Sequence, residues 1–135
     1  MFVSHSGEDT WVAKQIAYRI GRCGAKAFLD DLYIQGGADF EKDIRGFLKK
    51  ADELLVLLTP WALERPYVWA ELGAAWTRGI PIIVLLHGLT AAELEGKAGI
   101  PVFLKAKNWR KLNDADRYFT ELRKRVDRVR GPGVA

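Results

Sequence analysis

Two segments of the sequence bring together residue types that can hold a phosphate-bearing ligand and act on it. The first, Ser4-His5-Ser6-Gly7-Glu8-Asp9, stands between an apolar pair and a helical pattern. A loop of small hydroxyl residues and glycine at a helix N-terminus can cradle a phosphate or diphosphate. The spacing of Ser6 and Asp9 also resembles a capping box, which only satisfies free backbone N–H groups. Both interpretations of this loop remain open from the sequence.

The second segment carries a carboxylate among aromatic residues. Glu71 follows Pro66 in a helical pattern, and Tyr67, Trp69 and Trp76 surround it in sequence. The helix dipole alone favours a carboxylate near a helix start. Aromatic faces and partial desolvation, however, suit the recognition of a planar cationic ring. We predict that Glu71 is a functional carboxylate that acts on such a ligand. The alternative is that it only stabilises the start of the helix.

A long loop lies between these two segments. The stretch Asp30–Asp39 carries Leu32, Tyr33 and Ile34, followed by Gly36 and Gly37. A simple turn needs fewer residues, and loops of this length in a compact domain are often binding or lid segments. Apolar side chains with no evident place in a core favour contact with another molecule. We predict an assembly loop here, with a loop of incidental apolar residues as the alternative.

Short apolar runs alternate with helical spacings along the chain. The runs predict five buried strands at Phe2-Val3, Ala27-Phe28-Leu29, Leu54–Leu58, Ile80–Leu86 and Ile100–Leu104. Spacings of three and four predict helices that bury Val12, Ile16 and Ile20; Phe40, Ile44, Phe47 and Leu48; Val68, Leu72 and Ala75; and Phe119, Leu122, Val126 and Val129. A shorter, weaker helical pattern covers Thr90–Lys97. The alternation predicts an α/β fold, a flavodoxin-like five-stranded parallel sheet in the order 2-1-3-4-5 with helices on both faces. Ligands of such sheets bind beyond the carboxyl ends of the strands, which is where all three segments fall.

Composition indicates one globular domain. The chain has 135 residues, of which 49% are hydrophobic and 28% charged. We expect the domain to cover residues 1–130, with 131–135 as a tail or linker. The formal net charge is +4, and basic residues gather between Arg117 and Arg130. The apolar spacing within that stretch predicts a terminal helix that packs on the sheet. Its basic residues then form the solvated face of the helix and no nucleic-acid surface.

Several classes of protein are excluded by what the sequence lacks. Cys23 is the single cysteine, which excludes an internal disulfide framework. Cys23, His5 and His87 do not have the sequence spacing of zinc ligands. No apolar run is long enough to span a bilayer, and the first residues do not resemble a secretory signal. We therefore expect a cytoplasmic location and no membrane partner. A Gly-Lys-Ser/Thr phosphate loop is absent, and Ser4 and Thr59 stand where a phospho-receiver would need acidic residues.

Three motifs in order resemble a Toll/interleukin-1 receptor (TIR) domain of the bacterial type. They are Phe2-Val3-Ser4-His5-Ser6-x-Glu8-Asp9, Phe28-Leu29-Asp30 with Ile34, Gly37 and Phe40, and Pro66-Tyr67-Val68-Trp69-Ala70-Glu71-Leu72. The resemblance runs from Phe2 to the last helix. It implies an NAD glycohydrolase or cyclase that cleaves the nicotinamide–ribose bond, giving nicotinamide and ADP-ribose or a cyclic ADP-ribose in bacterial immune defence signalling. NAD is then the substrate, and neither a cofactor nor a metal is implied.

The resemblance also assigns roles to individual residues. Glu71 takes the catalytic position, touching the hydroxyls of the nicotinamide ribose. His5 lines the nicotinamide pocket, with Ser4 and Ser6 beside it. The remaining substrate-binding positions are Asp30, Gly37 and Tyr67. Two residues depart from the family pattern, since Arg65 stands where serine is common and Gly36 replaces a frequent proline.

A single carboxylate suits this reaction. Nicotinamide is a cationic leaving group, so it departs without a general acid, and one carboxylate can stabilise the oxocarbenium-like sugar that remains. Two alternatives stay open: a non-catalytic adaptor that acts by TIR–TIR contact, and an enzyme similar to nucleoside deoxyribosyltransferases. Besides NAD, the expected partners are other TIR domains and a sensor domain outside this chain.

Overall fold

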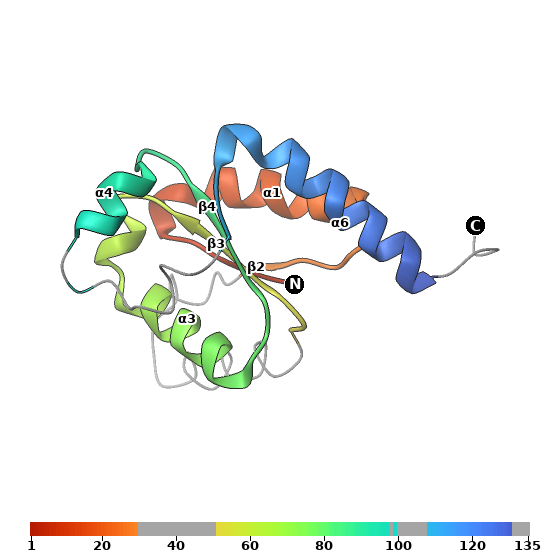
Figure 1. The fold of residues 1–135 in the computed structure, drawn as a ribbon, viewed down its shortest axis with the longest axis horizontal. Coiled ribbons are helices and arrows are strands. Elements are labelled where there is room, and N and C mark those ends of the chain that lie inside the picture. Colours follow the sequence, from red (N-terminus) through yellow and green to blue (C-terminus); the bar gives the residue numbers. More distant parts are fainter. Residues whose placement is uncertain (30–50, 98, 100–107, 131–135) are drawn as a thin grey trace.

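A five-stranded parallel sheet forms the centre of the computed structural model, which describes residues 1–29, 51–97, 99 and 108–130 (Figure 1). The strands are β1 (Phe2–Ser4), β2 (Phe28–Leu29), β3 (Leu54–Leu58), β4 (Ile82–Leu86) and β5 (Asn108–Lys111). Their order is β2-β1-β3-β4-β5, and every pair is parallel. The described α-helices are α1 (Thr10–Arg22), α3 (Pro66–Arg78), α4 (Ala91–Gly96) and α6 (Ala115–Arg130). The predicted flavodoxin-like sheet is confirmed.

The central strands are apolar throughout because both faces of the sheet are covered. All of β3 is buried, and successive side chains point into two separate cores. Leu54, Val56 and Leu58 pack with α3 and α4, whereas Leu55 and Leu57 pack with α1 and α6. Figure 1 shows α1 and α6 together on one face of the sheet and α3 on the other. The continuous apolar run of β3 follows from this double coverage.

The predicted helix face of Phe40, Ile44, Phe47 and Leu48 lies outside the described residues. In the helices that the structure describes, the other predicted faces are buried or partly buried, with one exception. Ile16 and Ile20 of α1 are buried, as are Val68, Leu72 and Ala75 of α3 and Phe119 and Leu122 of α6. The prediction for Val129 is wrong, because its side chain is 88% exposed. Helix α6 continues past the edge of the sheet, so its last turn has no core beneath it (Figure 1).

The fifth strand lies later in the chain than the sequence predicts. The expected run, Ile100–Leu104, falls outside the described residues, and the strand that pairs with β4 is Asn108–Lys111. Strand β5 is at the edge of the sheet and has a neighbour on one side only. An edge strand can be polar, and charged residues protect its open side, so an apolar run is a poor guide to it. The weak helix expected at Thr90–Lys97 is confirmed as α4.

A partly buried ion pair anchors α6 beneath the start of β3. The carboxylate of Glu53 accepts hydrogen bonds from both terminal nitrogens of Arg125, at 3.1 and 3.2 Å, and from the Tyr118 hydroxyl at 3.1 Å. A bidentate pair of this kind has well-defined geometry. Burial, together with the nearby Glu53 charge, raises the pKa of Tyr118 above its ordinary range. These contacts lie at the amino ends of the strands, opposite the carboxyl ends at which the loops considered next begin.

Candidate functional site

The carboxyl ends of β1 and β3 lie side by side at the point where the strand order reverses. Strand β1 pairs with β2 on one side and with β3 on the other, where Ser4 is in register with Val56. The loop after β1 and the loop after β3 therefore begin side by side, at the carboxyl ends of neighbouring strands. This is the position at which doubly wound sheets bind ligands.

A buried carboxylate joins these two loops. Asp9 Oδ2 accepts a hydrogen bond from Ser6 Oγ at 2.9 Å and another from Thr59 Oγ1 at 2.5 Å, and all three side chains are buried. Thr59 Oγ1 in turn accepts a hydrogen bond from the backbone N–H of Ala62 at 3.1 Å. The capping-box interpretation is wrong, because the Ser6 side chain makes no bond to the helix backbone. Ser6 and Asp9 instead belong to a side-chain network that connects the loop after β1 with the loop after β3.

An ion pair makes a second connection, between the loop after β1 and the start of α3. Arg65 Nη2 contacts Glu8 Oε1, and Ser6 Oγ lies 3.1 Å from Glu8 Oε2. A hydrogen bond from the backbone of Glu8 itself, with the contacts to Ser6 and Arg65, lowers the pKa of Glu8. Arg65 is the N-cap residue of α3, and Pro66 occupies the first helical position. Arg65, the departure from the family pattern, thus holds two site segments together.

Glu71 lies in the second turn of α3 and is only 1% exposed. The first turn of this helix holds no acidic residue. Because the effect of the helix dipole falls off within one turn, helix-start stabilisation does not account for Glu71. A buried carboxylate is costly unless its surroundings compensate it, and such groups gather at functional sites.

The aromatic residues around Glu71 have different environments. Tyr67 is partly buried and packs against the core on the α3 side of the sheet. Trp69 Nε1 donates a hydrogen bond to the carbonyl of Leu63 at 2.9 Å, which ties α3 to the turn that precedes it. Trp76 is half exposed. The sequence places these rings near Glu71, but in the structure Trp69 fixes the helix and Trp76 faces solvent.

Ser4 and His5 are buried where β1 ends. The ring nitrogen Nδ1 of His5 lies 3.3 Å from the carbonyl oxygen of Val3. Ser4 Oγ has no hydrogen-bond partner among the residues that the structure describes. Since an unsatisfied buried hydroxyl costs about 1–3 kcal/mol, this atom is well suited to a ligand that supplies the missing bond.

Other predicted site residues lie outside the described ranges. They are the substrate-binding candidates Asp30 and Gly37 and the assembly-loop residues Leu32, Tyr33 and Ile34. From the sequence, Asp9 is interpreted as a capping residue and as part of the first TIR-like motif, and Thr59 is not singled out as its partner. A signal for this pair exists, since a threonine directly after an apolar strand stands at the ligand-binding edge of a parallel sheet. Within the described ranges, no group of three or more His, Cys, Asp and Glu side chains could hold a metal ion, and no helix has the length and apolar character needed to cross a membrane.

The strand order and the loops beyond β1 and β3 define the class of protein, a flavodoxin-like α/β domain. Comparison with protein families matches residues 1–126 to the TIR domain, so the chain belongs to the TIR domain family. Among solved structures it is similar to the TIR domain of the Toll-related receptor TRR-2 from Hydra magnipapillata. That match has a TM-score of 0.65 and 19% sequence identity, and it covers 96% of this chain and 97% of the other. No curated protein matches the chain significantly. At this identity the structural match establishes the fold alone.

Proposed function

We propose that this TIR domain cleaves the bond between nicotinamide and ribose in NAD, with Glu71 as the catalytic residue. The burial of the Glu71 carboxylate in the second turn of α3 is the observation that carries the proposal. Family membership supports it, because the TIR family includes NAD-cleaving members. The bacterial type of the domain, its cytoplasmic location and its role in defence signalling belong to the same proposal and rest on the resemblance of the motifs.

The chemistry requires one negative charge beside the ribose. The C1′–N bond breaks heterolytically, and its electron pair leaves with nicotinamide, which becomes neutral. The ribose gains oxocarbenium character, which the Glu71 carboxylate stabilises. Water adding at C1′ gives ADP-ribose and a proton, whereas attack by a nitrogen of the adenine gives a cyclic product. A desolvated carboxylate acts more strongly than one in water, because the surrounding dielectric is low.

The loop after β1 supplies the rest of the proposed pocket. Ser4 Oγ, which lacks a partner among the described residues, can bond to a substrate hydroxyl. His5 lines the nicotinamide side. Ser6 donates to Asp9, so in this proposal it contributes mainly by holding the loop. The Glu8–Arg65 pair keeps that loop close to the helix that carries Glu71.

Nicotinamide release from NAD by the purified domain tests the proposal. Glu71→Gln preserves size and removes the charge, so activity should fall on the order of 10²–10³-fold, as when one preorganised electrostatic group is lost. Glu64→Gln is the matched control, because Glu64 is exposed on the turn just before α3. Both variants should keep the parental circular dichroism spectrum. A Glu71→Gln domain that cleaves NAD as fast as the parent would contradict the assignment.

A non-catalytic adaptor is the second candidate function. Family membership favours it, because TIR domains typically associate with other TIR domains. An adaptor acts by contact with other TIR domains and needs no chemistry at Glu71. If neither the free domain nor the domain clustered on a surface releases nicotinamide, while the domain still self-associates, the adaptor is the correct function.

A further inference from the structure

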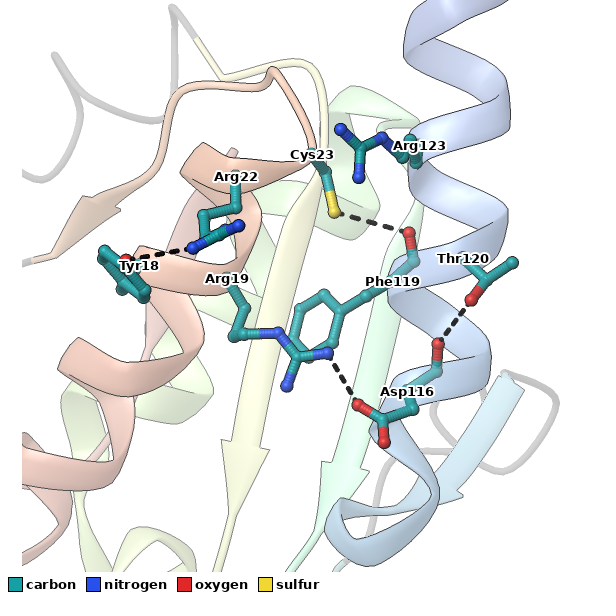
Figure 2. Close-up of a pocket in the computed structure, with 8 residues that line it drawn as sticks. All are labelled: Tyr18, Arg19, Arg22, Cys23, Asp116, Phe119, Thr120 and Arg123. Atoms are coloured by element: carbon teal, nitrogen blue, oxygen red, sulfur yellow. Dashed lines mark hydrogen bonds and ion pairs between the residues drawn. The ribbon is translucent and has the colours of Figure 1, made fainter.

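A hollow of about 570 Å³ lies between α1 and α6, on the face of the sheet opposite to α3 (Figure 2). Glu71 belongs to α3, so this hollow is separate from the site proposed above. Three arginines line it: Arg19 and Arg22 from α1, and Arg123 from α6. Among the described residues that line it, Asp116 is the one acidic side chain. The balance of charge in the hollow is therefore positive.

Asp116 is already neutralised by Arg19. Arg19 Nη2 lies 2.6 Å from Asp116 Oδ1, and the Arg19 guanidinium stacks on the Phe119 ring, 4.7 Å from its centroid. Figure 2 shows this pair at one end of the hollow, with the bond from Arg19 across to α6. The charges of Arg22 and Arg123 are thus left without an acidic counterpart in the hollow.

Arg22 of α1 and Arg123 of α6 both line the hollow, so cationic side chains from two helices border it. Arg22 Nη1 donates to the Tyr18 hydroxyl at 3.4 Å, which leaves its other N–H groups available. Arg123 makes no hydrogen bond or ion pair with any residue that the structure describes. In Figure 2 the Arg123 side chain extends from α6 toward the end of α1 that carries Cys23. Guanidinium groups from two helices that lack an acidic partner in the hollow favour the binding of an anion there.

Helix electrostatics explain only part of this arrangement. Arg19 and Arg22 stand in the last turn of α1, where the helix dipole favours cations. Arg123 lies in the middle of α6 (Ala115–Arg130), where the dipole has little effect. The planar donors of arginine match phosphate oxygens in a bidentate manner.

We propose that this hollow binds the diphosphate group of a nucleotide. Arg22 and Arg123 contact the phosphate oxygens from the two helices. Tyr18 is 61% exposed, and the Arg22 guanidinium lies over one face of its ring, 6.0 Å from the centroid, so the other face is offered to the base. The proposal does not depend on NAD cleavage, because none of these residues belongs to the catalytic site.

The test is titration calorimetry with pyrophosphate, ADP and adenosine at low salt. The Arg22→Gln/Arg123→Gln double variant should bind pyrophosphate and ADP at least about tenfold more weakly than the parent. Arg117→Gln/Arg128→Gln is the matched control, because it removes the same charge from exposed positions of α6 and should bind like the parent. ADP should bind more tightly than pyrophosphate, and Tyr18→Leu should abolish that difference. Adenosine alone should not bind.

Three results would overturn the proposal. The first is a parent domain that binds neither pyrophosphate nor ADP at concentrations up to about 10 mM, weaker than any useful affinity. The second is an equal loss of affinity in the two double variants, which would show a dependence on net charge alone. The third is ADP binding that only Glu71→Gln, and not the Arg22/Arg123 pair, affects. The last result would place the nucleotide in the catalytic site and leave the proposed function intact.

Discussion

Glu8 and Arg65 form an ion pair that joins the loop after β1 to the residue that caps α3. Both side chains are partly exposed, so the pair contributes little to global stability. Its effect is local, because it connects the segment of Ser4 and His5 with the helix of Glu71. The arginine at a position where the family commonly has serine thus has a structural role in this chain.

Breaking this pair should loosen the loop without unfolding the domain. We expect Arg65→Ser and Glu8→Gln each to speed amide hydrogen exchange in the loop after β1, with Tm changed by no more than about 4 °C. Because the pKa of Glu8 is lowered, the pair should persist as pH falls below 4.5 and be lost only as pH passes the lowered value. Hydrogen exchange followed by mass spectrometry measures the effect. Arg117→Ser is the control and should leave the loop unchanged.

Asp9 and Thr59 should be energetically coupled through their hydrogen bond. Thr59→Val removes a donor to a buried carboxylate, and Asp9→Ala leaves two buried hydroxyls without their acceptor. Each change should lower the free energy of unfolding by about 1–3 kcal/mol. In the double variant the losses should be less than additive, since both remove the same bond. Urea unfolding of the four proteins measures this coupling, and strict additivity would show that the bond contributes nothing.

Tyr118 should make the domain sensitive to alkaline pH. Burial and the Glu53 charge raise its pKa above the ordinary value of 10.0 in the folded state only. The resulting stability is fully present below pH 10 and is lost as pH rises above it, because the unfolded chain releases the proton first. Urea unfolding between pH 9 and 11 should therefore show a steeper decline for the parent than for Tyr118→Phe. Tyr18→Phe, which changes an exposed tyrosine, should decline like the parent.

The sequence predicts the features that depend on full burial. Strand β3 and the buried residues of α3 follow from runs and spacings of apolar residues, because an element covered by the core must be apolar wherever it is covered. The same argument fails at the boundary of the core. Strand β5 is polar because one side is open, and Val129 continues an apolar spacing beyond the end of the sheet.

Side-chain networks are harder to predict than elements. The motifs bring Ser6, Asp9 and Glu71 to notice, but residue types do not tell which hydroxyl donates to which carboxylate. Asp9 bonds to Thr59 across 50 positions in sequence, and only the pairing of β1 with β3 brings them together. Long-range pairing therefore decides the site geometry that local patterns leave open.

Self-association through residues 31–39 is the last property that we predict, and it concerns the activity directly. Leu32, Tyr33 and Ile34 are three consecutive apolar residues in a segment that follows β2, next to β1 in the sheet. A contact from this segment to a different surface of a second copy would be head-to-tail and would build open strands of domains. A neighbouring copy in contact with this segment would then also complete the proposed NAD pocket. Specific activity should therefore rise with protein concentration in the parent and stay low and flat in Tyr33→Ala/Ile34→Ser. Val129→Ser is the control, since it removes an exposed apolar side chain from α6 and should behave like the parent. Specific activity that is equal and independent of concentration in all three proteins would end the hypothesis.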